Sequence, residues 1–95
     1  MMEDKKERTF DVVVANKVDS VFKMLMEKNA KYGNSALNPC RIFSSASAEE
    51  QLLVRIDDKL SRIKNRKDDE DEDVIMDLVG YLILLMVSRD ERRAV

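Results

Sequence analysis

Hydrophobic residues recur at helical spacing in three stretches of this chain of 95 residues. The first stretch predicts an amphipathic helix over about 11–31, because apolar positions separated by three or four residues fall on one helical face. Its apolar residues are Val14, Val18, Val21, Phe22, Leu25 and Met26. Thr9 and Asp11 are both candidates for the N-cap, and Gly33 is a natural residue to end the helix.

The second stretch opens with Ser47 and Glu50, which have the spacing of a capping box. In that motif the serine hydroxyl accepts from the glutamate backbone, and the glutamate side chain accepts from the serine backbone. We therefore expect a helix over about 47–65. The core stripe predicted for it consists of Leu53, Ile56, Leu60 and Ile63.

Two segments outside the helices have different characters. Residues 1–9 are charged and polar, which predicts a flexible tail. Residues 32–46 contain Gly33, Pro39 and several asparagines and serines, which predict a loop. Its apolar residues favour an ordered loop, with a short helical turn near Cys40 to Phe43.

The third stretch, about 71–89, is apolar on nearly all sides, which is typical of a helix buried all round. One face contains Val74, Leu78, Leu82 and Leu85, widened by Ile75, Val79 and Met86, and the opposite face contains Met76, Ile83 and Val87. Either a homo-oligomer with this helix at a two-fold axis, or the first helix and the loop, would cover the second face. We predict an all-α domain spanning 1–95, a small bundle of three helices completed by oligomerisation.

Charge and composition exclude several classes of protein. The chain has 17 Lys and Arg against 19 Asp and Glu, a net charge of −2, so duplex nucleic acid is not expected as a partner. With no histidine and one cysteine, it has no Ser-His-Asp or Cys-His catalysis and no zinc site of the usual ligands. Any chemistry must come from carboxylates, Lys, Arg, Tyr or a bound metal ion.

No segment has the pattern of a membrane or secretion signal. The N-terminus lacks the apolar region of a signal peptide. The most apolar run, Val74 to Val87, is 14 residues long and contains Asp77, whereas a span needs about 20 apolar residues. We expect a cytoplasmic protein without a membrane partner.

Asp77 is the most informative charged residue, because it lies on the most apolar helix. A buried carboxylate must be ion-paired, protonated or bound to a cation. Asp73 lies one turn earlier on the same face, and two carboxylates so placed repel unless a positive group lies between them. That group is either Mg²⁺, which prefers carboxylate oxygens, or a Lys or Arg from the second helix.

The second helix supplies charges of both signs. Arg55, Asp58, Lys59 and Arg62 share one side at spacings of three, four and seven. In a purely structural interpretation, Arg55, Asp58 and Arg62 form surface ion pairs and Lys59 neutralises Asp77. Cys40 is then a small loop hydrophobe, and the six methionines are core filler or oligomer contacts.

Three segments together resemble the small nucleotide-modification-associated domain of phage and bacterial proteins, itself similar to the MazG-type all-α nucleoside triphosphate pyrophosphohydrolases. The segments are Lys28 to Ala36, Val54 to Arg62 and Glu72 to Tyr81. The resemblance spans about residues 20–88.

The resemblance implies an oligomeric all-α fold and a Mg²⁺ ion held by acidic pairs on adjacent helices. Carried over by position, the metal ligands are Glu50, Asp58, Asp73 and Asp77, of which Asp58 and Asp77 are the catalytic pair. The resemblance also implies that phosphate and nucleotide are contacted by Arg55, Lys59, Arg62, Lys31, Tyr32 and Asn34. In such enzymes a metal-activated water attacks the triphosphate and pyrophosphate is released.

The acidic pattern departs from the family at two places, since Leu53 stands where a glutamate is usual and the acid before Asp77 is at 73 rather than 74. Three hypotheses follow. The chain is a Mg²⁺-dependent (d)NTP pyrophosphohydrolase, or a non-catalytic phage protein that sequesters a nucleotide signal or inhibits a host defence protein, or a helical oligomer without a ligand.

Overall fold

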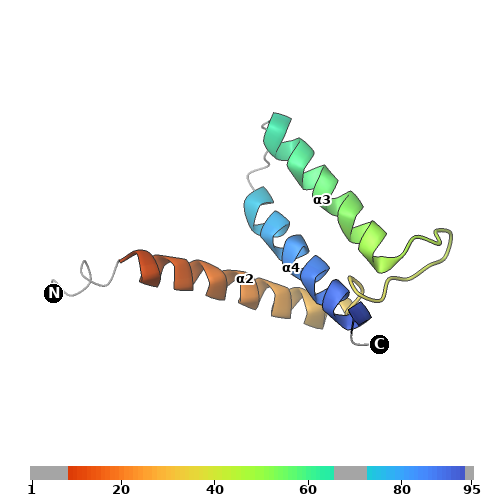
Figure 1. Cartoon of the computed structure of the whole chain (residues 1–95), viewed down its shortest axis with the longest axis horizontal. Helices are drawn as coiled ribbons and strands as arrows, with labels where there is room; N and C mark the ends of the chain where they lie inside the picture. Colours follow the sequence, from red (N-terminus) through yellow and green to blue (C-terminus); the bar gives the residue numbers. More distant parts are fainter. Residues whose placement is uncertain (1–8, 66–72, 94–95) are drawn as a thin grey trace.

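The computed structural model describes residues 9–65 and 73–93, which form three α-helices and, within these ranges, no strand. They are α2 (Phe10–Tyr32), α3 (Ala48–Asn65) and α4 (Val74–Arg93) (Figure 1). The all-α fold predicted from the sequence is confirmed. The expected tail before Thr9, and the acidic run before Asp73, lie outside the described residues.

Helix α2 begins and ends where local side-chain chemistry dictates. Thr9 is the N-cap, since its hydroxyl oxygen accepts from the backbone N–H of Val12 at 3.4 Å. Gly33 ends the helix in the left-handed region, at φ 64°, and its N–H donates to the Asn29 carbonyl at 2.8 Å. Glycine adopts this conformation without steric cost, which explains why the helix stops here.

Helices α3 and α4 are also capped by side chains. The Ser47 hydroxyl accepts from the Glu50 N–H at 3.1 Å, and the Glu50 carboxylate accepts from the Ser47 N–H at 3.4 Å, so the predicted capping box is confirmed. At α4, Asp73 Oδ1 accepts from the Met76 N–H at 2.9 Å. Asp73 directly precedes α4, which begins at Val74 and continues past 89 to Arg93.

The connection between α2 and α3 turns earlier than expected. Its hydrogen-bonded turn is closed by the Asn34 carbonyl, which accepts from Leu37 and Asn38 at 3.3 and 3.1 Å. The helical turn predicted near Cys40 to Phe43 is absent, because the backbone there only bends. Phe43 is fully exposed, so its ring packs against no residue that the structure describes.

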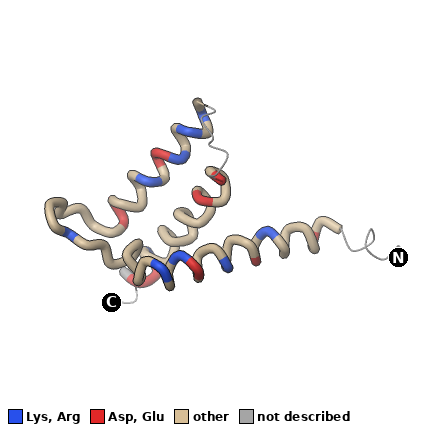
Figure 2. The backbone as a smooth tube through the Cα atoms, turned by 180° about the vertical axis from the view of Figure 1, so that it is seen from behind, with Lys and Arg blue, Asp and Glu red and all other residues tan. Residues whose placement is uncertain are grey.

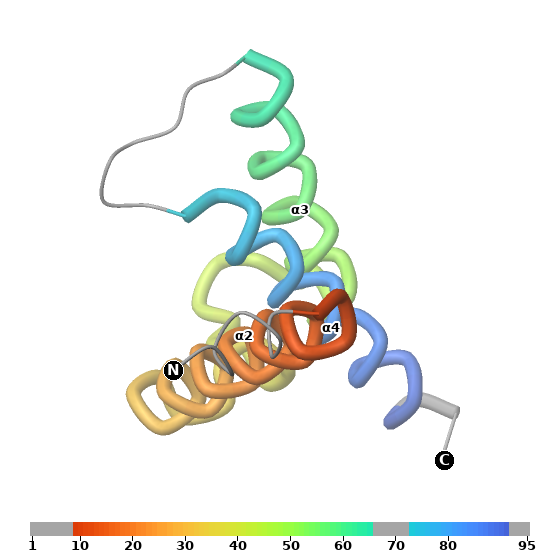
Figure 3. Tube along the Cα trace, turned by 90° about the vertical axis from the view of Figure 1, so that its left-hand side faces the viewer, coloured from red at the N-terminus to blue at the C-terminus, as the bar shows by residue number. Residues whose placement is uncertain are grey.

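Helices α3 and α4 lie side by side, and α2 crosses α4 with its C-terminal half (Figures 1 and 3). The crossing is close at Gly80, where an added Cβ would lie 2.8 Å from Met24 Cε. The N-terminal half of α2 projects away from the other helices. The Cα radius of gyration is accordingly 16.4 Å, against about 12 Å for a compact domain of this length.

The core is small and lies chiefly between α3 and α4. The buried apolar residues of the described chain are Val21, Leu52, Ile56 and Val74. The stripe predicted for α3 was wrong except at Ile56, since the helix buries Leu52, Ile56 and Lys59 while Leu53, Leu60 and Ile63 are exposed. The reason is that α4 alone covers α3, on the side of Leu52, and α2 does not reach the other side.

Helix α4 is apolar nearly all round, and the described residues cover only part of it. Val74 is buried, and Met76 and Ile83 of the predicted opposite face are half-buried. Four apolar residues that helical spacing placed on the first face or at its edge are exposed, namely Ile75, Val79, Leu82 and Met86. None of the three described helices combines the length and apolar character that crossing a bilayer requires.

Candidate functional site

An ionic cluster of one carboxylate and two lysines joins the three helices. Asp77 of α4 lies with Oδ2 3.6 Å from Nζ of Lys59 on α3, and with Oδ1 3.5 Å from Nζ of Lys28 on α2. The exposed fractions of the Asp77 and Lys59 side chains are 18% and 11%, so their ion pair is largely withdrawn from solvent. The predicted pairing of Lys59 with Asp77 is confirmed.

Lys28 is the member of this cluster that sequence reasoning missed. It lies in the first of the segments that carry the family resemblance, yet nothing in its spacing indicates a partner 49 positions later. The contact depends on where α2 crosses α4. Close packing at Gly80, one turn beyond Asp77, brings the C-terminal half of α2 within reach of that carboxylate.

A cavity of about 500 Å³ lies beside this cluster, within the usual size range of small-molecule sites. All three helices and the 33–47 connection contribute to its wall. The wall consists of Met24, Leu25, Lys28, Asn29, Tyr32, Ser35, Ala36, Pro39, Cys40, Gln51, Leu52, Arg55, Asp77, Gly80, Tyr81 and Leu84. Apolar side chains and a few polar groups thus surround one concave space.

The polar part of this wall has a surplus of positive charge. Lys28 and Arg55 line the cavity, and only Asp77, which also pairs with Lys59, opposes them. The Arg55 side chain makes no hydrogen bond or ion pair to any residue that the structure describes. Its guanidinium is therefore an unused set of donors at the edge of a cavity, which suits an anionic ligand.

Two tyrosines add aromatic surface to the same cavity. Tyr32 is the last residue of α2, and Tyr81 follows Gly80 on α4. The crossing of these two helices therefore determines the positions of both tyrosines. Lys31 Nζ lies 5.5 Å from the centre of the Tyr32 ring, so a further cation lies near the C-terminal end of α2. Of the predicted nucleotide contacts, Tyr32 lines the cavity, whereas Lys31 and Asn34 do not.

The remaining predicted phosphate and catalytic residues lie elsewhere on α3. Arg62 Nε is 3.3 Å from Asp58 Oδ2, and both residues are outside the cavity wall. This is the surface ion pair of the structural interpretation. Arg55 and Arg62 share a face of the helix but are two turns apart, so only Arg55 reaches the cavity.

The acids expected to hold Mg²⁺ are not gathered together. Glu50 is used in the capping box, Asp73 caps α4, Asp58 pairs with Arg62, and Asp77 contacts two lysines. Across residues 9–65 and 73–93, no three carboxylate or thiol groups form a set able to hold a metal ion. The magnesium site stays a sequence-based prediction.

Comparison of the chain with protein-family models, curated proteins and solved structures found no match.

Proposed function

We propose that this protein binds a nucleotide or a nucleotide-derived small molecule in the cavity between α2, α3 and α4. The observation that carries the proposal is the position of Arg55, a guanidinium without an ionic partner in the described chain, at a cavity that Lys28 also lines. Arginine matches phosphate with two parallel hydrogen bonds, and lysine adds a point charge.

The rest of the wall suits the remaining parts of such a ligand. Tyr32 and Tyr81 offer aromatic faces, and bases stack on such faces whatever their sequence identity. Asn29 and Gln51 offer amide donors and acceptors for a base or sugar. Asp77 holds Lys28 at the cavity while its other oxygen pairs with Lys59, so it acts as a positioning residue.

Binding without hydrolysis is the function that this arrangement supports best. A pyrophosphohydrolase needs a carboxylate set that grips a metal and activates water. Here Asp58 lies outside the cavity wall and both oxygens of Asp77 face lysines. A protein that binds and does not cleave would sequester a nucleotide signal, which is the non-catalytic role considered from the sequence.

The test is isothermal titration of the full chain with deoxynucleoside triphosphates, cyclic dinucleotides and ADP-ribose, with and without Mg²⁺. Pyrophosphate is assayed afterwards. We expect one of these ligands to bind intact and without a need for metal. In Arg55→Ala its affinity should fall on the order of 10- to 100-fold, because a charged hydrogen-bonding group is lost.

Arg62→Ala is the matched control, because it removes a guanidinium from the same helix but outside the cavity wall. It should bind nearly as the unmodified protein does. Equal losses in both variants would favour the residue set implied by the family resemblance over the cavity. Pyrophosphate release would establish the hydrolase, and absence of binding to every ligand would overturn the proposal.

A further inference from the structure

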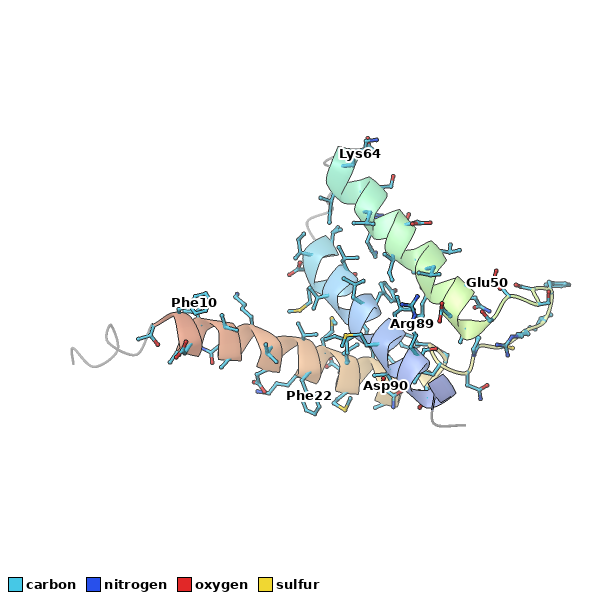
Figure 4. All side chains as sticks on the ribbon, in the orientation of Figure 1. Phe10, Phe22, Glu50, Lys64, Arg89 and Asp90 are labelled. Carbon is cyan, nitrogen blue, oxygen red and sulfur yellow. The ribbon has the colours of Figure 1, made fainter. Side chains whose placement is uncertain are left out.

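An apolar stripe on α2 continues past the point where its own chain covers it. Val21 is buried and Leu25 is half-buried where α2 crosses α4. At helical spacing the same face continues through Val18, Val14 and Phe10, whose side chains are exposed by 61%, 42% and 81%. Phe10 stands at the far end of the projecting half of α2 (Figure 4). The face that packs in one half of α2 is thus uncovered in the other.

Helix α4 carries the complementary stripe. Ile75, Val79, Leu82 and Met86 recur at spacings of four, three and four, and all are exposed. They lie about half a helical turn away from Asp77 and Gly80, the residues that meet α2. This uncovered stripe therefore faces away from the α2 helix of the same chain.

The two stripes match in length, and the part of α4 that carries its stripe is uncharged. Residues 10–20 of α2 and 75–86 of α4 each extend for about 16 Å at the rise of an α-helix. No charged residue occurs between Leu78 and Ser88, and the trace of α4 carries charge only towards its ends (Figure 2). An apolar helical face can therefore pack along this part of α4 without burying a charged side chain of α4.

The uncovered apolar area is large enough for a stable interface. The residues of the two stripes expose on the order of 700 Å² per chain, within the roughly 600–1,000 Å² that each partner buries in a standard interface. The core of the single chain is small, so burial of this apolar surface would add substantially to its stability.

We propose that the occupant of these stripes is a second copy of this chain. The N-terminal half of α2 in each copy packs along the Ile75–Met86 stripe of α4 in the other. A two-fold axis between the two α4 helices satisfies both contacts at once. Each α4 is then enclosed by its own α2 on one side and by the α2 of the second copy on the opposite side.

The observation that selects a second copy over an unrelated protein is that both halves of the contact belong to one chain. The stripe on α2 projects beyond the bundle, and the stripe on α4 lies on the side that the chain's own α2 cannot reach. A reciprocal exchange buries both with one symmetry operation. This arrangement differs from direct packing of α4 on α4, in which the projecting half of α2 would stay exposed.

The test is sedimentation or light scattering of the full chain over a dilution series, where we expect twice the 11.0 kDa of one chain. Val18→Lys and Leu82→Glu should each weaken the dimer on the order of 100-fold, as for central interface residues. A mixture of these two variants should recover dimer, because the introduced lysine faces the introduced glutamate at one contact and the other contact is unchanged. Val12→Lys, on the opposite face of α2, is the control and should remain dimeric.

Both substituted positions are exposed in the single chain, so the helical circular dichroism of the variants should be unchanged. If either variant fails to fold, chains carrying Val18→Cys and Leu82→Cys in a Cys40→Ser background are mixed and treated with a short bismaleimide. Cross-links between the two kinds of chain are expected. A monomeric unmodified protein, a dimer indifferent to Val18→Lys, or cross-links only between Leu82→Cys chains would overturn the proposal.

Discussion

Lys59 and Asp77 meet between α3 and α4, with Nζ 3.6 Å from Oδ2 and both side chains mostly buried. The other oxygen of Asp77 lies 3.5 Å from Lys28 Nζ. One carboxylate therefore connects all three helices and fixes a lysine at the wall of the cavity. The stability of the fold and the charge of the proposed binding site depend on the same residue.

Removing the carboxylate of Asp77 should destabilise the fold. In Asp77→Leu two lysines remain close together without the charge between them, and we expect a loss of about 1–3 kcal/mol in the free energy of unfolding. Lys59→Met together with Asp77→Leu should recover most of this loss, since an apolar pair can replace a buried ion pair. Urea denaturation of both variants measures the loss and its recovery. An Asp77→Leu protein of unchanged stability would contradict the prediction.

Truncation of two neighbouring leucines on α3 should show which face of this helix is buried, the observed one or the one predicted from helical spacing. Leu52 is 2% exposed, so Leu52→Ala should lower the free energy of unfolding by about 2–5 kcal/mol. Leu53 is 38% exposed, and Leu53→Ala should lower it by less than about 1 kcal/mol. Thermal and urea unfolding of the two variants measure the difference. The reverse order would show that α3 packs with its other face inward.

The crossing of α2 over α4 should be sensitive to the size of residue 80. Gly80→Ala places a Cβ against the flexible end of Met24, which can move aside, so we expect a change within about 1 kcal/mol. Gly80→Leu should push α2 away and destabilise the protein by about 1–3 kcal/mol. Adding Met24→Ala to Gly80→Leu should restore part of the loss. If Gly80→Leu unfolds like the unmodified protein, the helices do not cross at this point.

The role of Asp73 can be tested by a conservative capping substitution. As the N-cap of α4 its carboxylate accepts from the Met76 N–H, so Asp73→Ala should lower the free energy of unfolding by about 1 kcal/mol. Asp73→Ser keeps a capping oxygen and should retain most of the stability. Ligand affinity, measured by titration in the same variants, should be nearly unchanged. A large loss of affinity in Asp73→Ser would instead favour the metal-ligand role implied by the family resemblance.

The cavity residues show where reasoning from the sequence reached its limit. Arg55, Lys59 and Arg62 recur at helical spacing and therefore share one side of α3. In the structure, however, Arg55 lines the cavity, Lys59 pairs with Asp77 and Arg62 pairs with Asp58. Helical spacing shows which residues share a face and does not show how far along the helix a neighbouring element crosses. For the same reason Lys28 was not identified as a partner of Asp77.

The sequence alone determined the three helices, most of their ends and the requirement that Asp77 be neutralised. Caps such as Thr9, Gly33 and the Ser47–Glu50 box act within four residues, and a carboxylate on an apolar helix is costly wherever that helix packs. Only the tertiary structure decided that α3 buries Leu52 rather than Leu53, that Lys28 joins Asp77 and that half of α2 projects. These features depend on where helices cross, and crossing is set by packing between residues distant in the chain.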